Sequence, residues 1–239
     1  MQISVRDLMR IFQAEEKTIY GWIAKKKMPC VKVSEQYRFN YVELLEWALE
    51  NRIALTPDIL ALGEHKPNGS CILSEALKAG GVYCDVPGRS REEVLKNVVG
   101  LLPLPVEINR SSLLEMFLTR ESMESTAIGN GVALPHLRSP VVLNIDGPLV
   151  SLCFLRNAVD FNASDRKPVS TLFVLVSPST KRHLLILSRL SFCLQDPGFQ
   201  KYLQMKAPKE QMVAEAIVVE SRLALQRKAG GKTPTKQGP

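Results

Sequence analysis

The hydrophobic pattern of the first fifty residues predicts a small unit of three helices and a hairpin. A first amphipathic helix follows the capping residue Ser4, and its apolar face consists of Val5, Leu8, Met9 and Phe12. Farther along, the pattern predicts a helix from residues 15–16 to the break at 28–29, a hairpin over 31–39 and a last helix after Asn40. This order of elements is typical of a small winged helix-turn-helix.

The next long segment predicts a second and larger unit in which helices and strands alternate. Its apolar periodicity predicts helices over 73–79, 90–101, 110–120, 178–195 and 208–222, and strands over 131–135, 149–155 and 170–176. This mixed order favours an α/β sandwich over a helical bundle or an all-β fold. The fold class predicted for the whole chain is therefore α+β, with a winged helix-turn-helix followed by a mixed sheet flanked by helices.

Breaker residues and charge divide the chain into four parts. We predict a DNA-binding unit over residues 1–52, a linker over 53–69 that is rich in Pro, Asn and Gly, a second domain over 70–222 and a basic disordered tail over 223–239. The net charge of +7 comes mostly from the ends: the first 52 residues carry nine basic and seven acidic side chains, whereas the last 18 carry five basic and no acidic ones. The neutral middle indicates that nucleic-acid binding belongs to the first unit.

Composition excludes several classes of protein. Hydrophobic residues make up 45% of the 239 residues, and no apolar run reaches the roughly 18–20 residues of a membrane span. The five cysteines are scattered without a CxxC pair, which favours reduced thiols over a disulfide framework or a zinc cluster. We therefore expect a cytoplasmic protein without a membrane segment, a bound metal or another cofactor.

The second predicted helix has the chemistry of a DNA-reading helix. On its outer face and on the wing, lysines, hydroxyls and an arginine can reach phosphates, and the candidate DNA-binding residues are Lys17, Thr18, Tyr20, Lys25, Lys26 and Arg38. This unit resembles the excisionase-like branch of the MerR-type helix-turn-helix family in its Thr-x-Tyr phrase, its basic run, its Pro29 and its closing Leu-x-x-Trp. One such unit contacts few base pairs of double-stranded DNA, so useful affinity requires a homodimer or other help.

Two of the three histidines lie where a phosphoryl group can be handled. His136 follows a predicted strand directly after Pro135, and His183 lies in the first turns of a predicted helix, where free amides attract anions. Arg120 and the hydroxyls of Ser125 and Thr126 are suited to support a phosphohistidine. Because the chain has no Walker loop, another phosphoprotein is a better donor than a nucleotide. The third histidine, His65, lies in the linker, and we expect no role for it.

The second unit resembles the enzyme IIA family of the sugar phosphotransferase system, the fructose/mannitol type that includes nitrogen-regulatory proteins. The resemblance covers about 150 residues and is carried above all by the phrase LTRESMESTAIGNGVALPH. It implies that His136 accepts a phosphoryl group from an HPr-like carrier protein, with His183 as the second histidine and Arg120 facing the phosphate. The phrase departs from the family at Ala127 and Leu137, where the family usually has glycine.

Three functions are compatible with this sequence. The first is a regulator in which the phosphorylation state of a IIA-like domain controls the attached DNA-binding unit. The second is a phosphocarrier of a sugar transport system, and the third is an interaction module that no longer accepts phosphate. We favour the regulator, because a pure carrier would have little use for residues 1–52.

Overall fold

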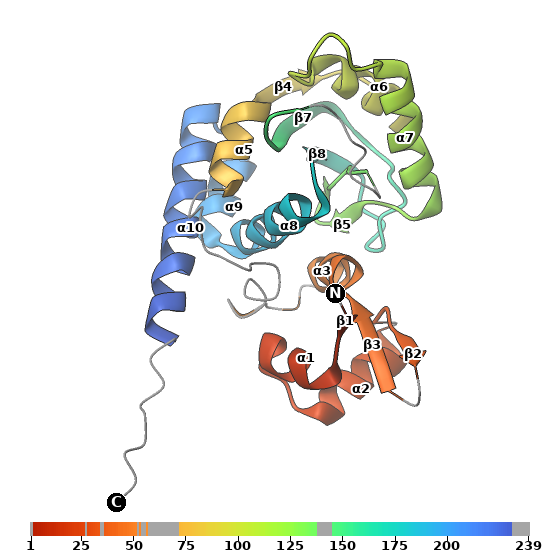
Figure 1. The fold of residues 1–239 in the computed structure, drawn as a ribbon. Helices are drawn as coiled ribbons and strands as arrows, with labels where there is room; N and C mark the ends of the chain where they lie inside the picture. The colour runs from red at the N-terminus through yellow and green to blue at the C-terminus, as the bar shows by residue number, and fades with distance from the viewer. Residues whose placement is uncertain are drawn as a thin grey trace, which may run out of the picture.

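The computed structural model describes residues 2–26, 28–33, 36–51, 53, 56, 72–137 and 145–230. These residues form two modules, which are distinct in Figure 1. We call the part from β1 to α3 the N-terminal module and the part from α5 to α10 the C-terminal module. The predicted fold class is confirmed: a helix-turn-helix precedes a mixed α/β sandwich.

The N-terminal module forms from the elements that the sequence predicts, with one additional short strand. Its elements are β1 (Gln2–Ile3), α1 (Val5–Phe12), α2 (Glu16–Lys25), β2 (Val31–Val33), β3 (Gln36–Asn40) and α3 (Tyr41–Glu50). The predicted cap is also confirmed, because Ser4 and Asp7 form a reciprocal capping box at the start of α1. The hairpin of β2 and β3 is the predicted wing, and β1 pairs with the other edge of β3.

An aromatic cluster holds the three helices of this module together. The rings of Phe12, Trp22 and Trp47 meet edge-on or tilted, with centroids 5.4–6.2 Å apart. The indole N–H of Trp47 on α3 also donates to the carbonyl of Lys26 at the end of α2, at 2.8 Å. Helix α3 is therefore fixed to the helix that carries the candidate DNA-binding residues.

The C-terminal module contains a mixed sheet between two helical layers. Its elements are α5 (Ile72–Gly80), β4 (Val82–Val86), α6 (Arg91–Leu101), α7 (Arg110–Met123), β5 (Ala127–Gly129), β6 (Val132–Ala133), β7 (Leu149–Val159), β8 (Val169–Val176), α8 (Thr180–Gln195), α9 (Pro197–Gln204) and α10 (Lys209–Gly230). Among the described residues the sheet has five strands in the order β4-β7-β8-β6-β5. The β4/β7 and β6/β8 pairs are parallel, and the β7/β8 and β5/β6 pairs are antiparallel.

Alternation along the central strands explains the two layers. In β7, Leu152 and Phe154 pack on the side of α5 and α8, whereas Cys153 and Leu155 pack on the side of α6 and α7. Both faces of the sheet are thus buried, as Figure 1 shows. The end of α5 approaches β7 so closely that a Cβ on Gly80 would lie 2.2 Å from the carbonyl oxygen of Val150.

A buried carboxylate joins the first and last helices of the C-terminal module. Glu220 on α10 accepts hydrogen bonds from the backbone N–H groups of Leu73 and Ser74 and from the Ser74 hydroxyl, at 2.7–3.1 Å. It therefore caps the start of α5. Burial raises the pKa of the Glu220 carboxyl, although these hydrogen bonds lower it in part.

The structure corrects one prediction of the sequence and adds three elements to the C-terminal module. Helix α10 continues to Gly230, so the predicted tail is wrong for residues 223–230; Leu223 is buried and no breaker precedes the glycine pair. The strands β4 and β5 were not predicted, and α9 is a separate helix that begins at Pro197. Most of the predicted linker with His65, the lysine at position 27 and residues 231–239 lie outside the described residues.

Candidate functional site

His136 lies where β6 ends, beside the carboxyl end of β8. It forms a parallel bridge with Leu175, whose N–H donates to the carbonyl of Pro135 at 2.9 Å. The side chain is 3% exposed, and its Nδ1 lies 2.8 Å from the carbonyl oxygen of Leu134. Because a carbonyl oxygen only accepts hydrogen bonds, this contact places the imidazole proton on Nδ1 and leaves the lone pair on Nε2.

His183 lies against His136 from the first turn of α8. The two ring centroids are 5.1 Å apart, and the ring planes are inclined by 40°. Helix α8 begins at a capped terminus, where Ser179 accepts from the N–H of Arg182. The positive end of the α8 dipole is therefore directed to the two imidazoles, which favours an anion at this place.

Arg120 lies in the last turn of α7, and Ser125 and Thr126 lie in the loop between α7 and β5. A guanidinium N–H of Arg120 donates to the carbonyl of Glu124 at 2.7 Å. The Ser125 hydroxyl donates to the carbonyl of Phe161 and accepts from the N–H of Ala127. The described contacts of these three residues thus shape the loop, and their roles toward a phosphate stay predictions.

A fourth residue, Glu121 in the last turn of α7, has no counterpart among the residues predicted from the sequence. Its carboxylate accepts from the N–H of Thr126 at 3.2 Å and from the Thr126 hydroxyl at 2.6 Å. Burial raises the pKa of the Glu121 carboxyl, whereas the bonds from Thr126 and the charges of Arg91 and Arg120 lower it in part. The only sequence signal was its position beside Arg120.

Hydrogen bonds connect Glu121 to His136. The carbonyl of Thr126 accepts from the N–H of Leu134 at 2.9 Å, and the carbonyl of Leu134 lies 2.8 Å from His136 Nδ1. The carboxylate that fixes Thr126 therefore also fixes the residue that orients the imidazole.

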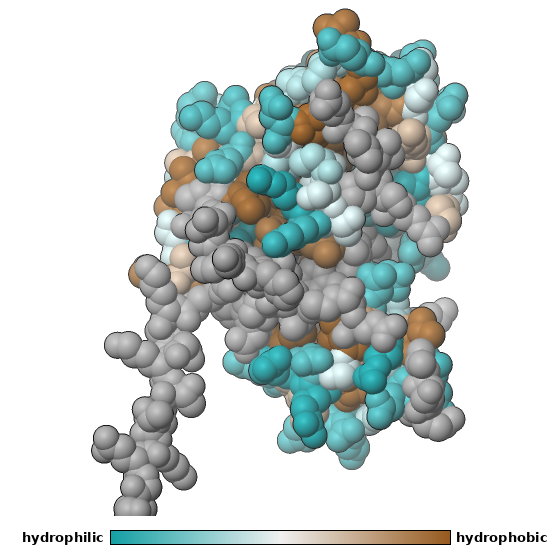
Figure 2. Space-filling model, in the orientation of Figure 1, coloured by the Kyte–Doolittle hydropathy of each residue, from teal (hydrophilic) through white to brown (hydrophobic). Residues whose placement is uncertain are grey.

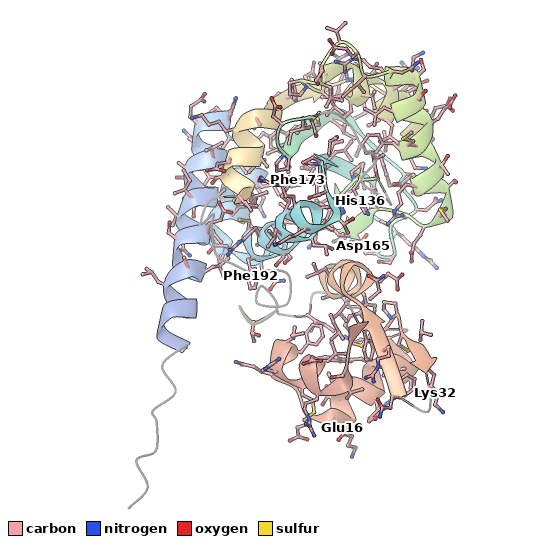
Figure 3. The ribbon with its side chains drawn as sticks, viewed as in Figure 1. Glu16, Lys32, His136, Asp165, Phe173 and Phe192 are labelled. Carbon is pink, nitrogen blue, oxygen red and sulfur yellow. The ribbon has the colours of Figure 1, made fainter. Side chains whose placement is uncertain are left out.

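The turn between β5 and β6 is held by Asp165, which the sequence did not single out either. Gly129, Asn130 and Gly131 have φ of 83°, 54° and 74°, a conformation that favours glycine. The Asp165 carboxylate accepts from the N–H of Asn130 at 2.8 Å and from that of Lys167 at 3.1 Å. In Figure 3, Asp165 lies on the side of the C-terminal module that faces α3.

The candidate DNA-binding residues lie together on α2 and the wing. Five of them are exposed, namely Lys17, Thr18, Tyr20, Lys25 and Lys26. The ring of Tyr20 packs edge-on against Tyr37 of the wing with centroids 5.8 Å apart. Arg38 is half-buried and donates to the side-chain oxygen of Gln36 at 2.6 Å. Figure 3 labels Glu16 and Lys32 on the side of this module that is remote from His136, and Figure 2 shows mostly hydrophilic side chains at this end of the molecule.

Comparison with known families identifies both modules. The family model described as "Phosphoenolpyruvate-dependent sugar phosphotransferase system, EIIA 2" matches residues 75–218. The chain belongs to this family. A second model, described as "Helix-turn-helix domain", matches residues 3–52. The C-terminal module is therefore an EIIA domain and the N-terminal module a helix-turn-helix domain, as the sequence predicted; the excisionase-like branch stays a prediction.

Individual relatives match the EIIA domain. A nitrogen regulatory protein of Pseudomonas aeruginosa is 32% identical over 150 residues, which are 61% of this chain and 94% of that protein. A fructose-specific EIIABC component of Bacillus subtilis is 28% identical over 148 residues, which are 61% of this chain but 23% of that protein. The solved structure of the nitrogen regulatory protein IIA-Ntr from Neisseria meningitidis is 26% identical, with a TM-score of 0.53, and the match covers 61% of this chain and 99% of that one. The fold of the EIIA domain is thus shared with nitrogen-regulatory relatives.

Three further observations concern the described ranges alone. No helix there is long and apolar enough to cross a membrane. No three His, Cys, Asp or Glu side chains of these ranges gather as the ligands of a metal would. Cys30, Cys84, Cys153 and Cys193 are free thiols, and burial raises the pKa of Cys153 to about 12.

Proposed function

We propose that this chain is a regulator of the phosphotransferase system, in which phosphorylation of His136 controls the helix-turn-helix domain. The observation that carries the proposal is the pair of imidazoles at the head of α8, on the same chain as a helix-turn-helix domain. The phosphoryl donor is an HPr-like carrier protein, and the target of the helix-turn-helix domain is double-stranded DNA.

The geometry of His136 suits a nucleophile. Its proton resides on Nδ1 toward Leu134, so Nε2 presents the lone pair. Nε2 attacks the phosphorus of the donor phosphohistidine; a new N–P bond forms, the donor's N–P bond breaks, and the donor imidazole leaves with the electron pair. The amides at the start of α8 and the imidazole of His183 stabilise the negative charge on the phosphoryl oxygens.

Arg120 is proposed to bind the phosphoryl group as the family resemblance implies. A guanidinium presents five N–H donors in a planar fork, and this geometry matches the oxygens of a phosphate. Its buried position in the last turn of α7 places it next to the loop that leads to β5.

The leucine after His136 does not argue for a domain that has lost phosphorylation. Leu137 is 6% exposed and packs in the cluster on the side of α6 and α7. His136 is directed to the opposite side, where its ring meets His183 on α8. The larger side chain therefore extends away from the nucleophile, which supports the regulator over the inactive module.

The test mixes the full chain with a phosphorylated HPr-like protein and follows acid-labile phosphate. Wild type is expected to be labelled, His136→Ala to remain unlabelled, and His183→Ala to be labelled more slowly, because that change removes support and not the nucleophile. Equal labelling of wild type and His136→Ala would overturn the assignment of the acceptor. Operator affinity of the phosphorylated and unmodified protein then separates the regulator from a plain phosphocarrier, for which the two affinities are equal.

A further inference from the structure

Helix α3 contacts the EIIA domain as well as its own domain. It lies against α8 and β5, and Figure 1 shows it between the two domains. One continuous cluster of buried apolar side chains includes Leu44, Leu45 and Ala48 of α3 together with residues of α8, and Ile128 of β5 packs against this cluster. The domains are therefore joined by an apolar contact.

The two sides of α3 have different neighbours. Trp47 packs against Phe12 and Trp22 of the helix-turn-helix domain. Leu45 points about 160° away from Trp47 on a helix with 3.6 residues per turn, yet none of its surface is exposed. Trp47 and its neighbours lie on the other side of the helix, and α3 also contacts β3 of its own domain and β5 and α8 of the EIIA domain.

The elements that α3 covers are the ones that frame the phosphoacceptor site. His183 lies in the first turn of α8, and β5 forms the hairpin that leads to His136. The two histidines are 6% and 3% exposed. Phosphoryl transfer requires the reacting atoms to approach to about 3–3.5 Å, so a donor protein cannot reach Nε2 while the site is covered.

The charge of α3 would also oppose a phosphoryl group close to it. The segment Tyr41–Glu50 contains three glutamates, of which Glu43 is exposed, and no lysine, arginine or histidine. A phosphohistidine carries about two negative charges, which an apolar helix face cannot solvate. Packing of α3 on the site would therefore disfavour a phosphorylated His136 in two ways: the phosphoryl group would lose its hydration, and the glutamates of α3 would repel it.

We propose that α3 is an intramolecular lid on the phosphoacceptor site, so that docking of the helix-turn-helix domain and phosphorylation of His136 exclude each other. While α3 is docked, phosphoryl transfer from the donor to His136 is blocked, and once His136 is phosphorylated, α3 no longer docks on the EIIA domain. The mutual exclusion with phosphorylation rests on the proposed function, whereas the claim that α3 limits access to the two histidines does not.

The test measures access to the histidines with a small reagent that needs no phosphoryl donor. The full chain is treated with diethylpyrocarbonate, and modification of His136 and His183 is followed by peptide mass spectrometry. Leu45→Ser on α3 and Ile128→Ser on β5 weaken the contact from opposite sides. Arg6→Ala, at an exposed position of α1, is the matched control.

Both contact variants are expected to react faster than wild type by about 5–150-fold, the usual range of coupling between two sites, whereas Arg6→Ala reacts at the wild-type rate. Far-UV circular dichroism and the fluorescence of Trp22 and Trp47 verify that each variant is folded. Should Leu45→Ser fail to fold, Ile128→Ser in the other domain carries the test. Equal reaction rates in wild type and a folded contact variant would overturn the lid. Faster modification without phosphate transfer from a phosphorylated HPr-like protein would uphold the lid and refute the proposed function.

Discussion

Replacing Glu121 with alanine is expected to loosen the loop that orients the phosphoacceptor. The substitution removes the acceptor of the Thr126 N–H and of the Thr126 hydroxyl, and Thr126 is 5% exposed. A buried polar group without a partner costs about 1–3 kcal/mol. Two such groups would cost about 2–6 kcal/mol, but the substitution also removes the unfavourable desolvation of the carboxylate, so we expect the EIIA domain to lose about 2–4 kcal/mol of unfolding free energy.

The tryptophans make this loss measurable within the full chain. Both of them, Trp22 and Trp47, belong to the helix-turn-helix domain, so their fluorescence reports on that domain, whereas far-UV circular dichroism in urea is dominated by the larger EIIA domain. Glu121→Ala is expected to move the circular dichroism transition and leave the fluorescence transition in place. Glu124→Ala is the matched control, because it removes an exposed carboxylate but keeps the backbone carbonyl that accepts from Arg120. We expect this control to change stability by no more than about 0.5 kcal/mol.

Positioning of His136 has its own measurement. Glu121→Gln retains one acceptor oxygen, so it is expected to fold nearly as well as wild type but to accept phosphate about 2–12-fold more slowly, the equivalent of a lost hydrogen bond of about 0.5–1.5 kcal/mol. A folded Glu121→Ala with wild-type stability and a wild-type rate of phosphorylation would show that the chain of bonds from Glu121 through Thr126 and Leu134 does not hold the imidazole.

Three further outcomes are expected. Burial raises the pKa of Glu220 above its ordinary 4.5, so between these two pKa values the folded chain retains a proton that the unfolded chain releases. In urea titrations, wild type should therefore lose stability relative to Glu220→Gln as the pH rises from 4.5 through the folded pKa. Parallel pH profiles of the two proteins would contradict this. Lys17→Ala and Lys25→Ala should each lower the slope of log affinity for duplex DNA against log salt by about 0.9, and an unchanged slope would show that the lysine contacts no phosphate. Trp47→Phe should lower the unfolding free energy of the helix-turn-helix domain by about 1 kcal/mol, because the carbonyl of Lys26 loses its donor; an unchanged midpoint of the Trp22 fluorescence would contradict this.

The fold was predictable where one periodicity persists over many residues. The apolar face of α1 and the near-continuous apolar runs of β7 and β8 specify these elements without tertiary information. Strand β5 has three residues and β4 is mostly half-exposed, so neither shows a pattern that differs from a loop. Their pairing with β6 and β7 decides their structure, and this pairing is not written in the local sequence.

The site was predictable in its residue types but not in its supports. A histidine after a strand and a histidine in the first turn of a helix each suggested a site, but their contact depends on the parallel bridge between His136 and Leu175. Glu121 and Asp165 were missed because sequence reasoning treats a carboxylate as solvated unless a motif says otherwise. Only the tertiary structure brings the carboxylate oxygens of Glu121 and Asp165 to the N–H groups of Thr126 and Asn130, respectively.

In the proposed regulator, the route from His136 to DNA passes through α3 as a moving body and not through the field of the phosphate. At physiological salt, charges on the protein surface are screened over about 8 Å, whereas Glu16 of α2 lies on the side of the helix-turn-helix domain remote from His136. Helix α3 is tied to α2 by the bond from Trp47 to Lys26 and by the aromatic cluster. Releasing α3 from β5 and α8 therefore moves the DNA-reading helix without deforming it. The lid predicts that phosphorylation changes where the EIIA domain lies relative to DNA, and leaves the chemistry of the reading surface as it was.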